Sequence, residues 1–172
     1  EVTENYIFAG YSGYIDIFNR TSRSRITRSY PYNLEGRTTM YNGLRDITVN
    51  SAGNKMLVSL QEVVCEHDLN GYTISNKSFN SCKQIGVQRS EYEFRRSTFK
   101  TSRGGINRPV AAEYDSNGNI YVAQAVPTYT VQKFNSNGGY ITNYGSQNNP
   151  WVFFYGMEVG SNDKIYVGGW QK

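Results

Sequence analysis

The chain has few of the residues that most often carry chemistry, with one histidine and two cysteines among its 172 residues. No apolar run approaches the length of about 20 residues that crosses a bilayer, so we expect no membrane span. No segment repeats its apolar residues with the 3.6-residue period of a helix. Nucleophile-elbow, phosphate-loop and EF-hand motifs are also missing, which argues against the commonest hydrolase, nucleotide-binding and calcium-binding classes.

Charge of either sign is modest. The net charge is +4 with 18 basic residues, and many of the arginines fall within residues 20–45 and 89–108. Solvated arginines on loops and outer strands explain this mild bias more simply than an anionic ligand does. We therefore do not expect nucleic acid among the partners.

Strand- and turn-forming residues are abundant instead, with 15 tyrosines and 17 glycines. This composition favours strands joined by tight turns. A strand, a tight turn and an apolar strand at residues 112–123 recur at residues 47–59 and again at residues 157–168. A hairpin that repeats at a fixed spacing indicates a repeat architecture.

The repeating unit has four strands. The second strands align at four apolar positions, which are Phe8, Val58, Val122 and Val167. The third strands align at Phe18, His67 and Phe134. The fourth, more polar strands fall at residues 25–28, 72–75 and 140–143. The first and second strands are more apolar and are expected inward, and the fourth is expected outward.

Four antiparallel strands in about 45 residues match the blade of a β-propeller. Short strands at regular spacing also suit a β-sandwich, but the recurrence of one hairpin at blade period favours the propeller. We predict an all-β protein with one propeller domain, or part of one, over residues 1–172. Full blades are expected near residues 38–80 and 106–146, with an Arg-rich insertion near residues 81–105 and two incomplete terminal blades.

Both ends of the chain depart from the pattern. The first copy begins with its second strand, near residue 5, and the last copy stops after its second strand. Three explanations stay open: the chain is a piece of a longer propeller, several chains complete one ring, or copies join end to end in a filament. Because an unpaired strand edge attracts another strand, the last two predict self-association.

The second full blade carries specific motifs. Pro109 opens its first strand, an Asp-x-x-Gly-Asn turn follows at residues 115–119, an apolar-Tyr-Val strand at residues 120–122, and a Lys-Phe-x-x-x-Gly hairpin at residues 133–138. In these features the unit resembles the NHL repeat of β-propellers. It departs from that pattern at Gln124, where the family often has Asp, and the first full blade has no matching proline.

The resemblance implies a propeller fold and a range of functions. NHL-like propellers include protein- and RNA-binding modules, extracellular interaction domains, and lyases or esterases with a central metal. Such an enzyme would bring His and acidic residues to the central channel. Here the one histidine, His67, aligns with two phenylalanines and is predicted to fill the core.

Other candidate ligands are few. Cys65 lies two residues from His67 and would share its strand face, but no further Cys/His group has metal-site spacing. Asp115 and Asp163 fall in turns, where Asp normally bonds its own backbone. We predict no catalytic residue, no metal and no cofactor in this chain.

The two cysteines, Cys65 and Cys82, flank a predicted hairpin. A disulfide between them would contribute about 3 kcal/mol if the protein is exported, and free core thiols are the alternative. Glycosylation sequons at Asn19 and Asn76 are compatible with export. We therefore expect a secreted, extracellular protein.

Two segments are candidates for contact with a partner. The insertion departs from the repeat and is rich in Tyr and Arg, which are enriched at binding hot spots; its candidate residues are Tyr92, Phe94, Arg95 and Arg96. An aromatic cluster precedes the last hairpin, where packing between blades is the favoured use and a partner- or sugar-facing patch the alternative; its candidates are Trp151, Phe154 and Tyr155.

These observations predict a non-enzymatic extracellular interaction or structural module. Its partners would be copies of itself, joined through unpaired terminal strands, or other protein chains. Two alternatives stay open, namely part of an NHL-type metal-dependent lyase or hydrolase, and a glycan-binding propeller.

Overall fold

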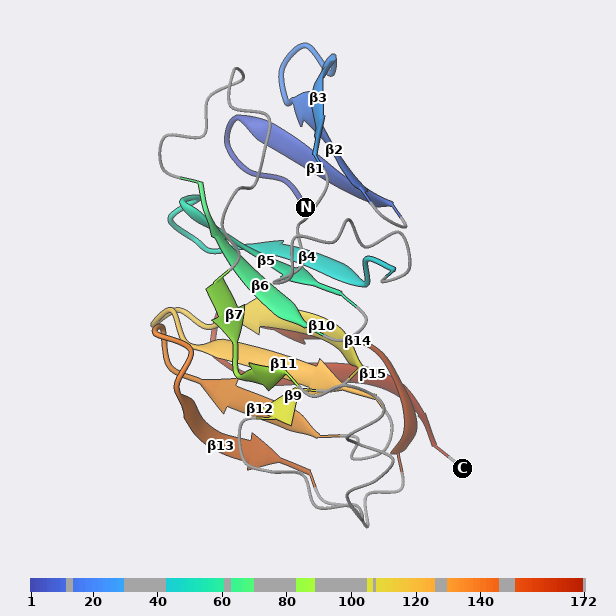
Figure 1. The fold of residues 1–172 in the computed structure, drawn as a ribbon, viewed down its shortest axis with the longest axis vertical. Helices are drawn as coiled ribbons and strands as arrows, with labels where there is room; N and C mark the ends of the chain where they lie inside the picture. The colour runs from blue at the N-terminus through green and yellow to red at the C-terminus, as the bar shows by residue number, and fades with distance from the viewer. Residues whose placement is uncertain are drawn as a thin grey trace.

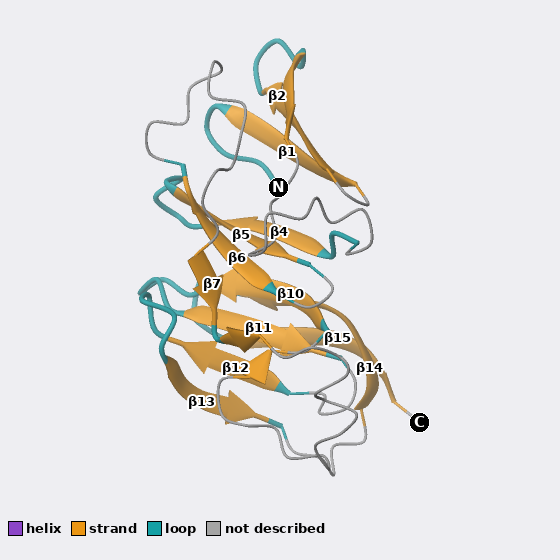
Figure 2. Cartoon of the chain, in the orientation of Figure 1, coloured by secondary structure: helices purple, strands orange, loops and turns teal. Residues whose placement is uncertain are grey.

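The chain folds into strands joined by turns, and the part that the structure describes contains no helix (Figure 2). The structure is a computed structural model, and it describes residues 1–11, 14–29, 43–60, 63–69, 83–88, 105–106, 108–125, 130–145 and 151–171. Within these residues no helix could cross a membrane.

Four antiparallel sheets follow one another along the chain. The first sheet contains β1 (Tyr6–Tyr11), β2 (Tyr14–Asn19) and β3 (Arg25–Ser29). The second sheet contains β4 (Asp46–Val49), β5 (Lys55–Ser59), β6 (Val64–Asp68) and β7 (Lys83–Ile85). The third sheet contains β10 (Pro109–Tyr114), β11 (Ile120–Gln124), β12 (Val131–Phe134) and β13 (Tyr140–Tyr144). The fourth sheet contains β14 (Trp151–Val159) and β15 (Ile165–Gln171).

The all-β prediction is therefore confirmed, and each predicted hairpin at residues 47–59, 112–123 and 157–168 is present. The fourth strand of the second sheet is β7, which begins beyond the expected blade boundary at residue 80. The strand expected at residues 72–75 lies outside the described residues. A short parallel pair, β8 (Val87–Gln88) with β9 (Gly105–Ile106), follows β7.

The turns within the hairpins have a common chemistry. In the third sheet, the Asp115 carboxylate accepts hydrogen bonds from the backbone N–H of Asn117 and of Asn119. Gly118 closes this turn at φ +77°, a left-handed conformation that glycine adopts without a Cβ clash. In the second sheet, Asn50 accepts equivalent backbone bonds. As predicted, these polar residues serve turn geometry.

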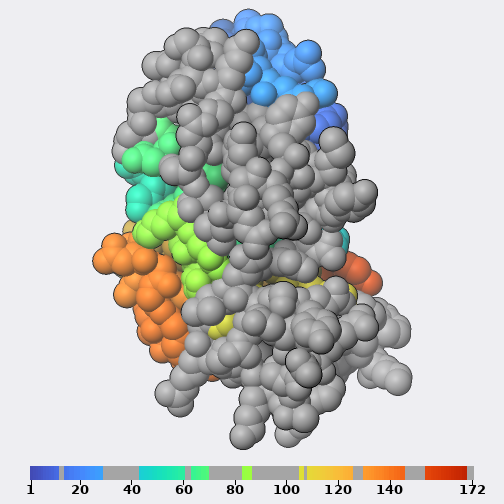
Figure 3. All heavy atoms as spheres, in the orientation of Figure 1, coloured from blue at the N-terminus to red at the C-terminus, as the bar shows by residue number. Residues whose placement is uncertain are grey.

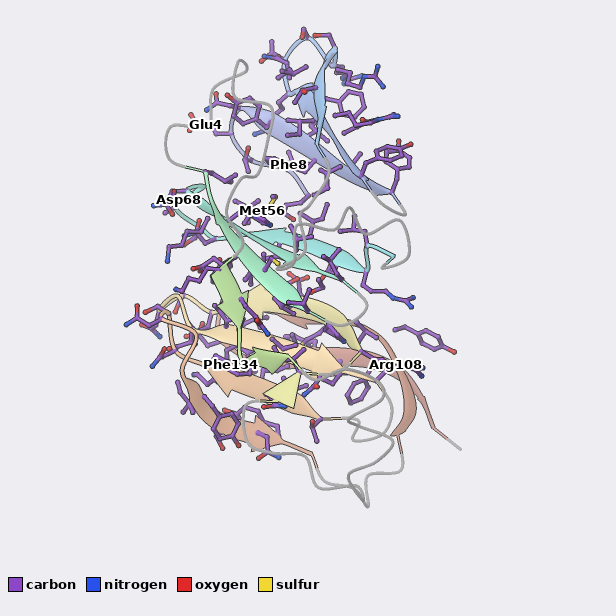
Figure 4. All side chains as sticks on the ribbon, viewed as in Figure 1. Glu4, Phe8, Met56, Asp68, Arg108 and Phe134 are labelled. Carbon is purple, nitrogen blue, oxygen red and sulfur yellow. The ribbon has the colours of Figure 1, made fainter. Side chains whose placement is uncertain are left out.

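Successive sheets pack face to face; the first three follow one another down the longest axis of the molecule, and the fourth packs against the third at the same height (Figure 1). The strands at one edge of each sheet lie next to one another: β1 beside β4, β4 beside β10, and β10 beside β14. Three apolar clusters fill the spaces between successive sheets. Phe8 and Met56, for example, point into the space between the first and second sheets (Figure 4). Burial of these faces holds the stack together.

One expected alignment is wrong by a single residue. On the third strands, the equivalent residues are Ile17, Glu66 and Lys133. Their partners on the second strands are Phe8, Leu57 and Tyr121, respectively. Phe8 therefore corresponds to Leu57 and Tyr121 and not to Val58 and Val122. The first hairpin is shorter, since Val2 already bridges Ile7. A slip of one residue sends a side chain to the other face of its sheet, so Phe8 faces the second sheet.

Candidate functional site

Carboxylates gather along the row of neighbouring edge strands β1, β4, β10 and β14, which we call the innermost strands. Glu113 pairs across its hairpin with Tyr121, and Glu158 pairs with Tyr166. Glu113 and Glu158 therefore occupy the same position in their respective sheets. Glu1 reaches the same position in the first sheet, where its backbone exchanges hydrogen bonds with Phe8. Asp46 lies nearby on β4. We call these four residues, Glu1, Asp46, Glu113 and Glu158, the carboxylate row.

Two of these carboxylates join neighbouring sheets. Thr48 occupies the register position of Glu113 in the second sheet, and its hydroxyl donates a hydrogen bond of 2.7 Å to Glu113 Oε1. Asp46 Oδ2 accepts a bond of 3.2 Å from the backbone N–H of Ala112, and its Oδ1 accepts one from Ile47. These polar contacts connect the second and third sheets at their inner edges, where no ladder pairing joins the described strands β4 and β10.

Burial, and to a lesser extent the neighbouring carboxylates, raise the pKa values in the row. Burial raises the pKa of Glu113 to about 8, the bond from Thr48 opposes the rise, and the charges of Asp46, Glu158 and Glu1 add to it. Burial likewise raises the pKa of Asp46, against the backbone bonds from Ala112 and Ile47. Glu113 therefore holds a proton near neutral pH and can exchange it there.

The row does not have the arrangement of a metal centre. Within the described ranges, no group of three or more His, Cys, Asp or Glu side chains could hold a metal ion. What the row can do is hold a proton on Glu113 between two sheets. The protonated carboxyl would still accept the bond from Thr48.

A second set of polar contacts connects the second and third sheets away from the carboxylate row. Glu66, which is 6% exposed, accepts hydrogen bonds from the Tyr114 hydroxyl at 2.9 Å and from Lys83 at 3.1 Å. Lys83 also donates to the backbone oxygen of Ser136 in the β12–β13 turn. In the space-filling view, β7 in light green borders the orange residues of the third sheet (Figure 3). Burial, with the charge of Glu66, raises the pKa of Tyr114.

The hairpin turns of the third and fourth sheets are also joined. Asp163 stands at φ +57°, where the corresponding turns have Gly53 and Gly118. Its carboxylate accepts hydrogen bonds from the backbone N–H and the hydroxyl of Ser116. Asp163 was expected to bond its own backbone, and it bonds the neighbouring turn instead.

The predicted partner-contact residues separate in the structure. Phe154 is 7% exposed and packs between the third and fourth sheets, the favoured use of its cluster, so it offers no surface to a partner. Tyr155, in the bulge of β14, is 76% exposed. Trp151 opens β14. The four candidates in the insertion, Tyr92, Phe94, Arg95 and Arg96, lie outside the described residues.

The remaining predicted residues are mostly buried. His67 is 1% exposed and pairs with Met56, at the place that Phe134 occupies in the third sheet, so its core position is confirmed. Cys65 is fully buried. Cys82 lies outside the described residues, so the pairing stays a prediction.

The glycosylation sites also stay predictions. The Asn19 side chain accepts hydrogen bonds from the backbone N–H of Thr21 and of Ser22 in a turn. Asn76 lies outside the described residues.

Sequence reasoning missed the carboxylate row. A usable signal was present, because Glu113 and Glu158 stand at matching places in the repeated hairpin. Glu1 and Asp46 could not be added from the sequence, since their places depend on the short first hairpin and on how the sheets stack.

Comparison with known proteins supports the fold. The sequence matches no protein-family model and no curated protein. Among solved structures, a protein of unknown function from Bacteroides caccae is similar to this chain, with a TM-score of 0.57 and 12% identity. The alignment covers 96% of this chain and 50% of that protein. Kuenenia stuttgartiensis hydrazine synthase matches 90% of this chain over 35% of its own, with a TM-score of 0.58 and 12% identity. This chain thus spans half or less of the length of these two proteins.

Proposed function

We propose that the chain is a non-enzymatic, exported interaction module, built as part of a β-propeller from NHL-like repeats, which associates through the open edge of β15. The observation that carries the proposal is the pairing of the second strands. β5 pairs with β4 and β6, and β11 pairs with β10 and β12. β15 corresponds to them, and among the described strands it pairs only with β14.

An unpaired edge exposes backbone groups that another strand can satisfy. Gly160 donates its N–H to the Lys164 carbonyl at the turn of this hairpin. Because paired residues alternate between hydrogen-bonded and non-bonded pairs, Tyr166 directs its backbone groups to β14 and Val167 directs its own to the open edge. The seven residues of β15 give this edge the length of an ordinary strand.

Substitution of Val167 tests the proposal. Proline at this position removes the outward N–H while an edge strand tolerates its ring, so Val167→Pro should weaken association. Val167→Ala is the matched control, because it trims the same side chain and keeps the N–H. Sedimentation equilibrium measures the association constant, and circular dichroism verifies the fold. Equal association of the two variants, or a wild-type chain that stays monomeric at its highest soluble concentration, would contradict the proposal.

A further inference from the structure

The two end faces of the stack have no neighbouring sheet within the described residues, and exposed apolar side chains gather on the end sheets. Six large apolar side chains are exposed in the described part of the chain. Four of them belong to the end sheets: Val2 and Tyr11 to the first, Tyr155 and Tyr166 to the fourth.

Tyr166 occupies a position that is buried elsewhere in the stack. Leu57, Tyr121 and Tyr166 pair with Thr48, Glu113 and Glu158, respectively, so they share one register position. Leu57 packs against the third sheet and Tyr121 against the fourth. Leu57 is 1% exposed and Tyr121 is 3% exposed, but Tyr166 is 56% exposed. Its place in the repeat is that of a residue covered by a following sheet.

We propose that the outer face of the fourth sheet, around Tyr166 and Glu158, docks onto the outer face of the first sheet of a second copy of the chain. The proposal rests on the function proposed above, since it assumes self-association, and it adds a second contact surface. It concerns sheet faces, whereas the function proposed above concerns the edge of β15.

The outer face of the first sheet has matching chemistry. Phe8, Ile15 and Ile17 face the second sheet, so alternation places Tyr14 and Asp16 on the outer face. Arg28 pairs with Asp16 at 2.8 Å and lies 3.7 Å above the Tyr14 ring. Arg25 extends beside them with its side chain 55% exposed. Tyrosine and arginine are the residues enriched at binding hot spots.

Charge favours this pair of faces over two copies of the same face. On the fourth sheet, Glu158 is exposed beside Tyr166. On the first sheet, Arg25 and Arg28 outnumber Asp16. Glu158 on one face is thus opposite in charge to Arg25 and Arg28 on the other, which favours a head-to-tail arrangement.

The number of sheets also suits two copies. The Bacteroides caccae protein has about twice the length that this chain matches. Two copies with four sheets each would bring eight together, within the range of about four to eight blades that close a propeller ring. Head-to-tail contacts between two copies then form twice, once at each junction.

The decisive experiment uses charge reversal and mixing. Glu158→Lys and Arg25→Glu should each weaken self-association, because both junctions of a homodimer then join like charges. An equimolar mixture should restore it, since one junction pairs Lys with Glu and the other keeps the wild-type residues. Tyr166→Ser should weaken the wild-type association by about tenfold or more, whereas Ile141→Ser, an exposed apolar residue of β13, should leave it unchanged.

Sedimentation equilibrium and native mass spectrometry read out each outcome. Association that is insensitive to Tyr166→Ser and to both charge reversals would overturn the docking proposal and leave the edge of β15 as the contact. Failure of the mixture to associate would overturn the head-to-tail arrangement. A wild-type chain that never associates would overturn both this proposal and the function proposed above.

Discussion

The carboxylate of Asp163 accepts two hydrogen bonds from Ser116, one of 2.9 Å from the backbone N–H and one of 2.8 Å from the hydroxyl. Asp163 makes these bonds from a left-handed backbone conformation that costs a non-glycine residue about 1 kcal/mol or more. The turns of the third and fourth sheets are therefore connected at the expense of local strain.

Substitutions at Asp163 separate the strain from the bonds. Asp163→Ala keeps the strain and loses both bonds, so we expect a loss of about 1–2 kcal/mol in the free energy of unfolding. Asp163→Gly loses the bonds and relieves the strain, so its loss should be smaller. Urea denaturation of both variants measures the difference. Equal stabilities would show that the backbone at this position carries no strain.

Glu113 should make stability depend on pH. Its pKa is about 8 in the folded chain against 4.5 in the reference state, so folding favours the protonated carboxyl. That contribution is complete below about pH 4.5 and is lost as the pH rises through about 8. Glu113→Gln stays neutral and can still accept the bond from Thr48. The variant should therefore gain stability relative to the wild type between these pH values.

Denaturation at a series of pH values measures this gain, which should level off once the wild-type Glu113 is ionised. Asp46→Asn provides a comparison, because the pKa of Asp46 is also raised by burial. A stability difference between Glu113→Gln and wild type that is constant from acid to alkaline pH would contradict the raised pKa of Glu113.

Tyr114→Phe removes the hydroxyl that donates to the buried Glu66 carboxylate. Loss of a hydrogen bond to a buried charged group costs about 1–3 kcal/mol, and we expect thermal unfolding to shift accordingly. Tyr140→Phe is the matched control, since its hydroxyl bonds Asn143 at an exposed site. An equal effect of the two substitutions would argue that Lys83 and Lys55, which also donate to Glu66, satisfy its carboxylate.

Gly10 allows the close approach of the first and second sheets. A Cβ at this position would collide with the Leu44 and Ile47 side chains. Gly10→Val should therefore destabilise the chain by about 1–3 kcal/mol through overpacking. Gly156→Val, where a Cβ meets no atom within 4 Å, should be tolerated. Chemical denaturation compares the two, and a neutral Gly10→Val would mean that the Leu44 and Ile47 side chains shift to make room.

Much of the fold could be predicted from local patterns. Turns such as that at Asp115 are determined by their own residues, because side-chain hydrogen bonds and a left-handed glycine specify them within a few positions. Strand order followed from the repeat. The register of Phe8 did not, because the repeat pattern does not reveal a hairpin that is shortened at the bridge between Val2 and Ile7.

The candidate site was less accessible from the sequence. Glu113 is unusual only because Asp46 and Glu158 reach it from neighbouring sheets, and such contacts depend on the stacking of distant segments. β7 was missed for a related reason. Its three residues are too few to show alternation, and pairing with β6 defines the strand.

The three separate apolar clusters have a thermodynamic consequence. The second and third sheets each contribute to two clusters, whereas the first sheet and the fourth sheet each contribute to one. Stability then follows nearest-neighbour rules, as in a short one-dimensional array, and the end sheets open at a lower free energy than the middle pair. The terminal sheets would be the fraying ends of such an array.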